Sequence, residues 1–246
     1  MNWRARYYED GYLRRWHLGP PGESEHRKAA AMLHLVGRSP PVSILDLGCG
    51  HGRYAGPLAK LGAEVVAMDA SLVLLHRALN QLGDVGRRIR WVQGEMSALP
   101  FCGLFDIVIL LSAFGYFNNE GDDEQLLTSV FEITATSGHI LLTNPNAALI
   151  RAEFQPQREE RREGRVVSIR SRLDEAGQWL EDDLVITDDL GEHQYQRRQR
   201  LYTASELTQL LECTGYVSVA HFADLDGAPF IESSASHIVT VGQRAA

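Results

Sequence analysis

The pattern of apolar and polar positions predicts strands and helices that alternate between residues 43 and 142. A short apolar run at residues 43–47 has the composition of a buried strand, and residues 54–61 have the spacing of a helix. The same patterns recur as strands at residues 64–68, 89–93, 105–108 and 138–142 and as helices at residues 72–82 and 122–134. Strands that alternate with helices form parallel sheets through right-handed crossovers, so this region predicts an open α/β sheet.

Two further helices are predicted before the alternating region. Helical spacing at residues 6–16 and 24–36 indicates them, and the turn-forming sequence Gly-Pro-Pro-Gly at residues 19–22 separates them. The first of these helices is rich in aromatic residues and arginine. We interpret the turn between the two helices as a hinge.

Residues 151–200 interrupt the alternation. Three runs of strand composition, joined by short turns, predict an antiparallel meander. These runs are residues 165–173, 178–186 and 194–202. The run at 158–165 alternates arginine with glutamate, which is typical of a solvated helix end or loop with internal ion pairs. A helix at residues 203–213 and a strand at 236–241 follow the meander.

Length and composition favour a single domain. A chain of 246 residues with 44% hydrophobic content can bury one sizeable core. We expect one domain over residues 1–246, with four parts. The parts are a helical segment at 1–40, a ligand-binding core at 41–150, an antiparallel insertion at 151–202 and the C-terminal part of the sheet at 203–246.

Charge, cysteine content and hydropathy exclude several classes of protein. A net charge of −8 disfavours binding to nucleic acid, which requires a basic face to neutralise phosphates. No apolar run approaches the ~20 residues that span a bilayer, and the N-terminus lacks the apolar core of a signal peptide, so we expect a cytoplasmic protein with no membrane contact. The three cysteines have no paired spacing, which indicates neither a disulfide framework nor a metal site.

The most specific segment is the predicted strand, turn and helix at residues 43–54. Gly48, Gly50 and Gly52 follow the strand directly, and glycine lets the backbone turn tightly and approach a ligand. In open α/β sheets such a corner binds nucleotides at the start of the helix. Asp69 ends the second predicted strand about twenty residues later, where an acid grips ribose hydroxyls.

Two classes of cofactor could bind at this strand–turn–helix corner. The dinucleotide fingerprint is G-x-G-x-x-G, whereas this chain reads G-x-G-x-G with Arg53 in the place of the third glycine. Asp46 stands in front of the turn and can face a cationic amino-acid tail. A ligand with such a tail and no pyrophosphate is S-adenosylmethionine, and a nicotinamide cofactor is the less favoured alternative.

The segment resembles motif I of the class I S-adenosylmethionine-dependent methyltransferases. Gly94, Glu95 and Met96, which follow the third predicted strand, resemble the acidic site where that family contacts adenine. The resemblance covers residues 42–143 and is weaker until residues 202–207, 215–216 and 236–241. It implies a Rossmann-like, seven-stranded, doubly wound sheet, with the N-terminal helices as a lid over the cofactor.

The resemblance and the glycine turn together imply a set of residues that hold S-adenosylmethionine. These are Tyr8, Arg15, Asp46, Gly48, Cys49, Gly50, Gly52, Arg53, Asp69, Ala70, Ser71, Glu95, Met96, Leu111 and Ser112. The aromatic residues of the first helix have an alternative interpretation, because they could simply pack on the core.

The acceptor site is expected beyond the fourth strand, because ligands in open α/β sheets lie past the carboxyl ends of the strands. Three aromatic residues gather there and suit a wall that excludes water. Candidate acceptor-binding residues are Tyr12, Phe114, Tyr116, Phe117, Asn144 and Asn146, and candidate catalytic residues are Tyr8, Tyr116 and His221. The alternative for the aromatic group is ordinary core packing under a loop, and for the two asparagines a plain turn.

The favoured function is methyl transfer from S-adenosylmethionine to a nitrogen or oxygen of a small molecule, such as a secondary metabolite. Alternatives are a peptide or protein N-methyltransferase, which a wide acidic cleft would suit, and a non-catalytic cofactor-binding scaffold. In similar enzymes the position of the 151–202 insertion carries a substrate cover or a subunit contact, so a homo-oligomer through this insertion is a further expectation.

Overall fold

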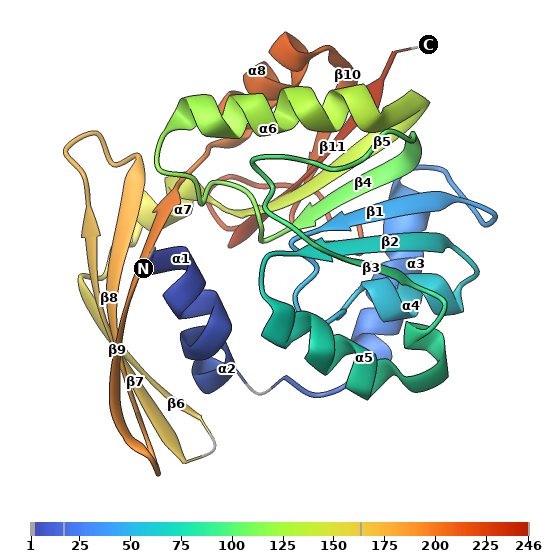
Figure 1. Cartoon of the computed structure of the whole chain (residues 1–246). Helices are drawn as coiled ribbons and strands as arrows, with labels where there is room; N and C mark the ends of the chain where they lie inside the picture. The colour runs from blue at the N-terminus through green and yellow to red at the C-terminus, as the bar shows by residue number, and fades with distance from the viewer. Residues whose placement is uncertain (1–2, 17, 163, 246) are drawn as a thin grey trace.

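The computed structural model describes residues 3–16, 18–162 and 164–245. Residues 1–2, 17, 163 and 246, which the expected ranges include, lie outside the described residues. The chain folds around a seven-stranded sheet, with a separate four-stranded sheet at one side (Figure 1). Among the described residues, no helix is long and apolar enough to cross a membrane.

The seven-stranded sheet has the order β10-β11-β5-β4-β1-β2-β3. Its strands pair in parallel except β11, which runs antiparallel to both β5 and β10. The strands are β1 (Ser43–Leu47), β2 (Glu64–Asp69), β3 (Arg90–Gln93), β4 (Phe105–Leu111), β5 (Thr134–Pro145), β10 (Tyr216–Phe222) and β11 (His237–Arg244). The predicted doubly wound, seven-stranded sheet is therefore confirmed.

Helices cover both faces of this sheet because alternate strand residues point in opposite directions. On β1, Leu45 and Leu47 belong to the core under α6 (Glu120–Ile133) and α8 (Ala204–Thr214), whereas Ile44 belongs to the core on the other face. That second core packs under α3 (Glu23–Leu35), α4 (Ala55–Lys60) and α5 (Leu72–Gly86) (Figure 1).

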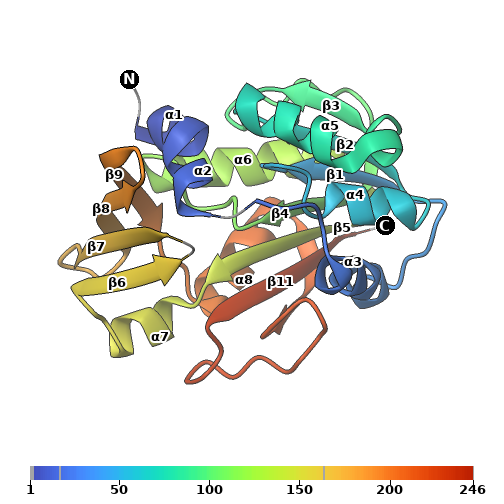
Figure 2. The same cartoon turned by 90° about the horizontal axis from the view of Figure 1, so that it is seen from below.

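The insertion forms an antiparallel sheet, as predicted, but with four strands instead of three. The short helix α7 (Ala147–Ala152) leads into it from β5 (Figure 2). The strands are β6 (Gln157–Arg162), β7 (Arg165–Leu173), β8 (Trp179–Asp188) and β9 (Gly191–Arg200). The expectation of a helix end or loop for the Arg/Glu-rich run was wrong: β6 is an edge strand whose charges alternate between a half-buried and an exposed face.

The N-terminal helix lies between the two sheets (Figures 1 and 2). It begins earlier than expected, with α1 (Trp3–Arg6), continues through a π-helical segment (Tyr7–Gly11) and ends with α2 (Tyr12–Arg15). Tyr7 is buried against Ile169, Leu184 and Tyr195 of the second sheet. A Cβ on Gly11 would lie 2.8 Å from the Tyr195 ring, so glycine permits this close packing.

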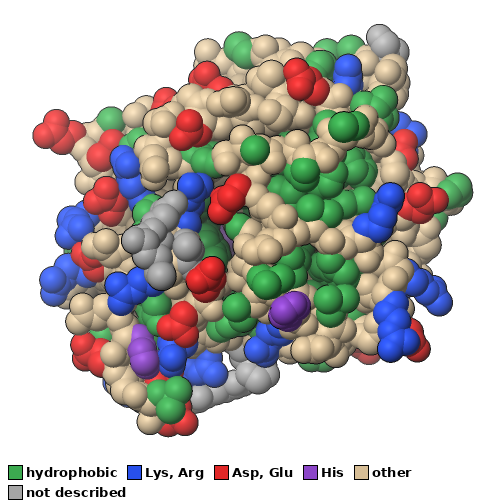
Figure 3. Space-filling model, viewed as in Figure 1, with side chains coloured by type: hydrophobic (Ala, Val, Ile, Leu, Met, Phe, Trp, Pro, Cys, Tyr) green, Lys and Arg blue, Asp and Glu red, His purple; other side chains and the backbone are tan. Residues whose placement is uncertain are grey.

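The surface over the second sheet carries mixed charge. On the face seen in Figure 3, acidic and basic side chains of the described residues are interspersed at the left of the view, where this sheet lies. This face therefore presents no uniformly basic surface within the described part of the chain.

Candidate active site

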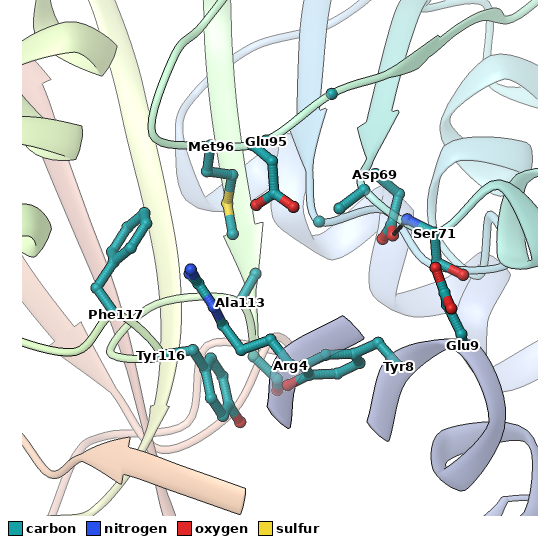
Figure 4. A pocket seen from close by; sticks show the side chains of 14 residues that line it. Arg4, Tyr8, Glu9, Asp69, Ser71, Glu95, Met96, Ala113, Tyr116 and Phe117 are labelled. Atoms are coloured by element: carbon teal, nitrogen blue, oxygen red, sulfur yellow. Dashed lines mark hydrogen bonds between the residues drawn. The ribbon is translucent and has the colours of Figure 1, made fainter. Parts of the chain in front are cut away.

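Two adjoining pockets open beyond the carboxyl ends of β1, β2 and β4. The first pocket lies against β2 and the loop after β3 (Figure 4). Five residues that were expected at the site from the sequence line this pocket alone: Ala70, Ser71, Glu95, Met96 and Phe117. The second pocket extends to the four-stranded sheet and takes in Tyr12, Gly50, Arg53 and Leu111. Both pockets are lined by Tyr8, Gly48, Asp69, Ser112 and Tyr116.

The glycine turn places its backbone at the junction of the two pockets. Gly48 has a φ of +71°, and a Cβ added there would lie 2.6 Å from the Cβ of Ala113, so a larger residue would both strain the turn and press into the pocket wall. Gly52 serves a different purpose, because an added Cβ would meet the Trp91 ring at 2.8 Å. Gly52 lines neither pocket and instead lets the turn pack against its neighbours.

Asp69 has both a structural role and free hydrogen-bonding capacity. Its Oδ2 accepts a hydrogen bond from the Gly50 N–H at 2.8 Å, and its Oδ1 accepts one from the Ser71 N–H at 2.8 Å. Burial raises the pKa of this carboxyl, although the same two hydrogen bonds work in the opposite direction. Each carboxylate oxygen can accept a further hydrogen bond, so Asp69 can hold a diol that enters the first pocket.

The remaining wall of the first pocket joins the sheet to the N-terminal helix. Glu95 and Met96 lie on one side, and Arg4 and Tyr8 of the helix lie on the other (Figure 4). The Arg4 guanidinium lies 5.2 Å from the centre of the Phe117 ring. Arg4 and Glu9 were not expected from the sequence, because only the packing of the helix brings them to this pocket.

Asp46 is buried in β1 and lines neither pocket. Burial, together with the charge of Asp69, raises its pKa from an ordinary value of 3.8 to about 7. The expected contact with a cofactor tail is therefore not visible in the geometry of the pockets. The shifted pKa instead gives Asp46 a measurable effect on stability.

We expect Asp46→Asn to stabilise the ligand-free protein at pH 8. A carboxyl whose pKa is higher in the folded than in the unfolded state binds its proton more tightly when folded, so stability falls as the pH rises from about 4 to about 7. The amide carries no charge, so the variant should gain about 1–3 kcal/mol in free energy of unfolding at pH 8. The gain should disappear as the pH is lowered towards 4.

Urea denaturation at pH 5 and pH 8 measures this difference. Asp84→Asn, at an exposed position of α5, is the control for loss of a carboxylate in general. An equal stability change at both pH values for Asp46→Asn would show that its pKa is not shifted.

Four tyrosines of the site, Tyr7, Tyr8, Tyr12 and Tyr116, are linked by ring contacts, most of which are edge to face. The Tyr8 ring lies 5.2 Å from Tyr7 and 6.1 Å from Tyr116, measured between ring centres. Burial raises the pKa of Tyr8 and of Tyr116, and it raises the pKa of Tyr12 to about 12. The phenols of Tyr8, Tyr12 and Tyr116 are therefore neutral near pH 7 and act as hydrogen-bonding groups and apolar walls.

The second pocket has a volume of about 730 Å³, within the usual range for small-molecule sites. One end is formed by residues that were not expected from the sequence, among them Phe154 after α7 and Leu180, Arg197 and Gln199 of the second sheet. The two-residue spacing of Arg197 and Gln199 on β9 places both on one face of the strand, but the sequence does not indicate that this face turns towards the pocket.

Three expected acceptor residues lie outside the pockets. Phe114 is fully buried and stacks on Tyr202, with 5.3 Å between ring centres, so it belongs to the core. Asn144 is buried and donates a hydrogen bond to the Phe114 carbonyl at 3.3 Å. Asn146 caps α7 and donates to the carbonyls of Glu232 and Ala235. Phe114 therefore packs in the core, whereas Asn144 lies inside β5 and Asn146 caps a helix, so the structure places none of the three beside the acceptor site.

His221 was expected to be catalytic, but its surroundings indicate a structural role. Its Nε2 and Nδ1 lie 2.7 Å and 3.0 Å from the hydroxyl oxygens of Thr208 and Thr240, and it lines neither pocket. Two further expected cofactor residues are also placed elsewhere. The Arg15 Nη2 donates to Glu160 at 2.8 Å, and the Cys49 thiol is buried behind the turn. Within the described residues, no cluster of His, Cys, Asp or Glu could hold a metal ion.

Comparison with known proteins identifies the core. Residues 44–138 match the family of methyltransferase domains. The chain is 30% identical over 120 residues to a malonyl-[acyl-carrier protein] O-methyltransferase from Pseudescherichia vulneris, covering 48% of this chain and 45% of that protein. It is also 30% identical over 148 residues to a cypemycin N-terminal methyltransferase from Streptomyces sp, covering 56% and 57% respectively. The chain thus spans about half the length of these curated relatives.

The fold is shared over a greater length. The CcbJ methyltransferase from Streptomyces caelestis superposes with a TM-score of 0.81 at 22% identity, covering 98% of this chain and 96% of that structure. The matched domain carries Asp46, the glycine turn, Asp69 and Glu95 in the order that the sequence resemblance implied. Residues 44–138 are therefore similar to a methyltransferase domain, and this region contains the residues that resemble motif I of the class I S-adenosylmethionine-dependent methyltransferases.

Proposed function

We propose that the protein transfers the methyl group of S-adenosylmethionine to a small-molecule acceptor, with an amine nitrogen favoured over a hydroxyl oxygen. The observation that carries this proposal is the junction of the two pockets, which share five lining residues. Methyl transfer requires cofactor and acceptor to meet in one dry space at near-attack distance. The first pocket suits the adenosine part of the cofactor, and the second has room for the acceptor.

The residues of the first pocket fit the cofactor. Asp69 would hold the ribose hydroxyls, Glu95 and Met96 would contact the adenine, and Gly48 lines the pocket with its backbone. When bound, S-adenosylmethionine supplies an electrophilic methyl group on a sulfonium, so the protein's task is alignment more than activation.

The neutral phenols of Tyr8 and Tyr116 would align the acceptor. Each phenol oxygen can accept a hydrogen bond from an amine N–H, which would orient the nitrogen lone pair, and the rings exclude water. Because burial raises the pKa of both phenols, neither is an effective base at neutral pH. A neutral amine needs no base in order to attack, whereas a hydroxyl benefits from one, so this geometry favours nitrogen.

A peptide N-terminus is the second candidate acceptor, favoured by the partial identity to an enzyme named for N-terminal methylation of cypemycin. A screen with S-adenosylmethionine labelled in its methyl group distinguishes the candidates. Small amines, phenols and hydroxylated metabolites form one panel, and short peptides with free or blocked N-termini form the other. Label found only in peptides with a free N-terminus would replace the small-molecule proposal with the peptide proposal.

The remaining alternative is a protein that uses a nicotinamide cofactor. This alternative predicts that the protein binds such a cofactor, which calorimetry tests. A homo-oligomer through residues 151–202 stays a prediction for sedimentation analysis.

Tyr116→Ala is expected to lower kcat/KM for the acceptor by a factor that corresponds to about 1–3 kcal/mol of lost transition-state stabilisation, because packing is lost and alignment is looser. Tyr116→Phe separates the ring from the hydroxyl, because only the hydrogen bond is lost. If the hydroxyl orients the acceptor, most of the effect should appear with Tyr116→Phe as a lower kcat. Unchanged kcat/KM in Tyr116→Ala would mean that Tyr116 only fills space. Phe114→Leu, in the core, is the control for general loosening of this loop.

A further inference from the structure

The inner face of the second sheet changes character along its length. Where the N-terminal helix covers it, the face is apolar and includes Val167, Ile169 and Ile186. Beyond the helix, a polar row crosses three strands: Ser171 is in register with Asp182, and Asp182 with Arg197. Asp182 and Ser171 are each only 2% exposed, so this row is built into the sheet at the edge of the second pocket.

The row is tightly hydrogen-bonded. The Ser171 hydroxyl donates to Asp182 Oδ1 at 2.6 Å, and Arg197 donates to Asp182 Oδ2 through both Nε and Nη2. Arg158, on the edge strand β6, donates to the Ser171 hydroxyl at 3.0 Å and lies 3.8 Å from Asp182. Asp182 thus fixes the Arg197 guanidinium by one edge, which leaves its Nη1 for another acceptor.

Positive charge is in excess around this row. Among the described residues, Asp182 and Glu160 are the acids of a connected network that contains Arg15, Arg158, Arg162 and Arg197, so four arginines share two carboxylates. Two of these arginines, Arg158 and Arg197, line the second pocket. Glu153 lines the same end and would offset part of this excess, and burial lowers the pKa of the lining His237, which keeps that ring neutral at neutral pH.

A stable sheet does not need such a network. A buried ion pair commonly contributes no more to folding than apolar residues of the same volume, because both charges lose their hydration. The same pair can serve binding, since an arginine held by a buried acid is pre-organised to receive a planar anion through its remaining N–H groups.

We propose that this end of the second pocket binds a carboxylate of the acceptor, with Arg197 making the direct contact and Arg158 supplying the second positive charge. This inference rests on the proposed function, because it assigns the substrate class of the same site. Tyr116 and Tyr8 line the pocket beside Arg197, so the methylated nitrogen would lie close to the carboxylate. An amino acid, or a metabolite that carries an amino-acid unit with a free carboxylate, has this arrangement of groups.

Calorimetry on the protein saturated with S-adenosylhomocysteine tests the proposal without turnover. The probes are aromatic and aliphatic L-amino acids, their amides and the matching aminoalkylphosphonates. At least one acid should bind about 10- to 100-fold more tightly than its amide, as expected for a charge-assisted hydrogen bond. The preference should weaken with added salt.

The variant Arg197→Gln/Asp182→Asn removes both buried charges together, so neither is left unpaired, and it should lose the preference for acid over amide. Arg172→Gln, at an exposed position on the outer face of β7, is the matched control and should keep it. Affinity for S-adenosylhomocysteine, measured on every variant, reports whether the fold is intact.

Three outcomes would overturn the proposal: no acid binds better than its amide, the double variant keeps the preference, or a phosphonate binds at least tenfold more tightly than the matching acid. Failure of this inference is distinct from failure of the proposed function. Methylation of neutral amines without any preference for acids would support methyl transfer and reject the carboxylate site. Selective binding of acids without methylation of any probe would support the carboxylate site and reject the proposed methyl transfer.

Discussion

Asp69→Ala is expected to weaken binding of S-adenosylmethionine by about 2–4 kcal/mol, because the ribose hydroxyls lose charge-assisted hydrogen bonds and stay buried. The structure adds a second reason. The Asp69 carboxylate also accepts hydrogen bonds from the N–H groups of Gly50 and Ser71, so its removal loosens the glycine turn that borders both pockets.

Two further variants separate these contributions. Asp69→Asn keeps one carbonyl oxygen as an acceptor and should lose less affinity than the alanine variant. Asp84→Ala removes an exposed carboxylate from α5 and should leave the affinity unchanged. Calorimetric titration with S-adenosylmethionine and with S-adenosylhomocysteine measures all three. An affinity of Asp69→Ala within twofold of the unmodified protein would reject Asp69 as the ribose ligand.

The part of the site that could be predicted from sequence is the part set by local geometry. Gly48 and Asp69 lie at strand ends, and the strand–turn–helix corner brings them to one edge of the sheet whatever the rest of the chain does. Their spacing along the chain was therefore enough to predict the first pocket.

Residues whose surroundings come from distant segments could not be predicted in the same way. His221 lies near the end of β10, where a catalytic group could stand, yet Thr208 on α8 and Thr240 on β11 contact both of its ring nitrogens. Phe114 and Tyr116 are two residues apart in the same aromatic loop, but Tyr202 draws the first into the core while the second faces the pockets. Only the packing of helices and strands far apart in sequence decides between such alternatives.

The second sheet shows the same limit in a different form. Its strands were recognisable by composition, but the Arg/Glu alternation of β6 fits both a solvated loop and an edge strand. Which face of β9 turns inward depends on how the sheet docks beside the N-terminal helix. The position of Arg197 in the second pocket could therefore be found only in the folded chain.

Removal of residues 1–16 is expected to lower methyl transfer by roughly 100-fold or more, because the acceptor loses its alignment and the pockets open to water. Tyr8 lines both pockets, and Tyr12 and Trp16 line the second. The cut leaves in place the Leu18 carbonyl, which accepts hydrogen bonds from Arg77 and Gln81.

The seven-stranded sheet should stay folded in this truncated protein. Its two hydrophobic cores contain no residue from the described N-terminal helix, whereas the core of the second sheet contains Tyr7. Part of the affinity for S-adenosylhomocysteine should therefore remain, since Asp69 and Glu95 are retained, and circular dichroism should show a cooperative unfolding transition.

The helix is also expected to move with the second sheet instead of opening as an independent lid. Arg14 pairs with Asp188 at 2.9 Å, and Arg15 pairs with Glu160 at 2.8 Å, so opening at the predicted hinge would break both contacts. Amide exchange should then show residues 6–16 protected before any ligand binds. Rapid exchange there in the ligand-free protein, with protection only after S-adenosylhomocysteine is added, would favour a free lid. Full activity of the truncated protein would instead show that the helix aromatics only pack on the sheet.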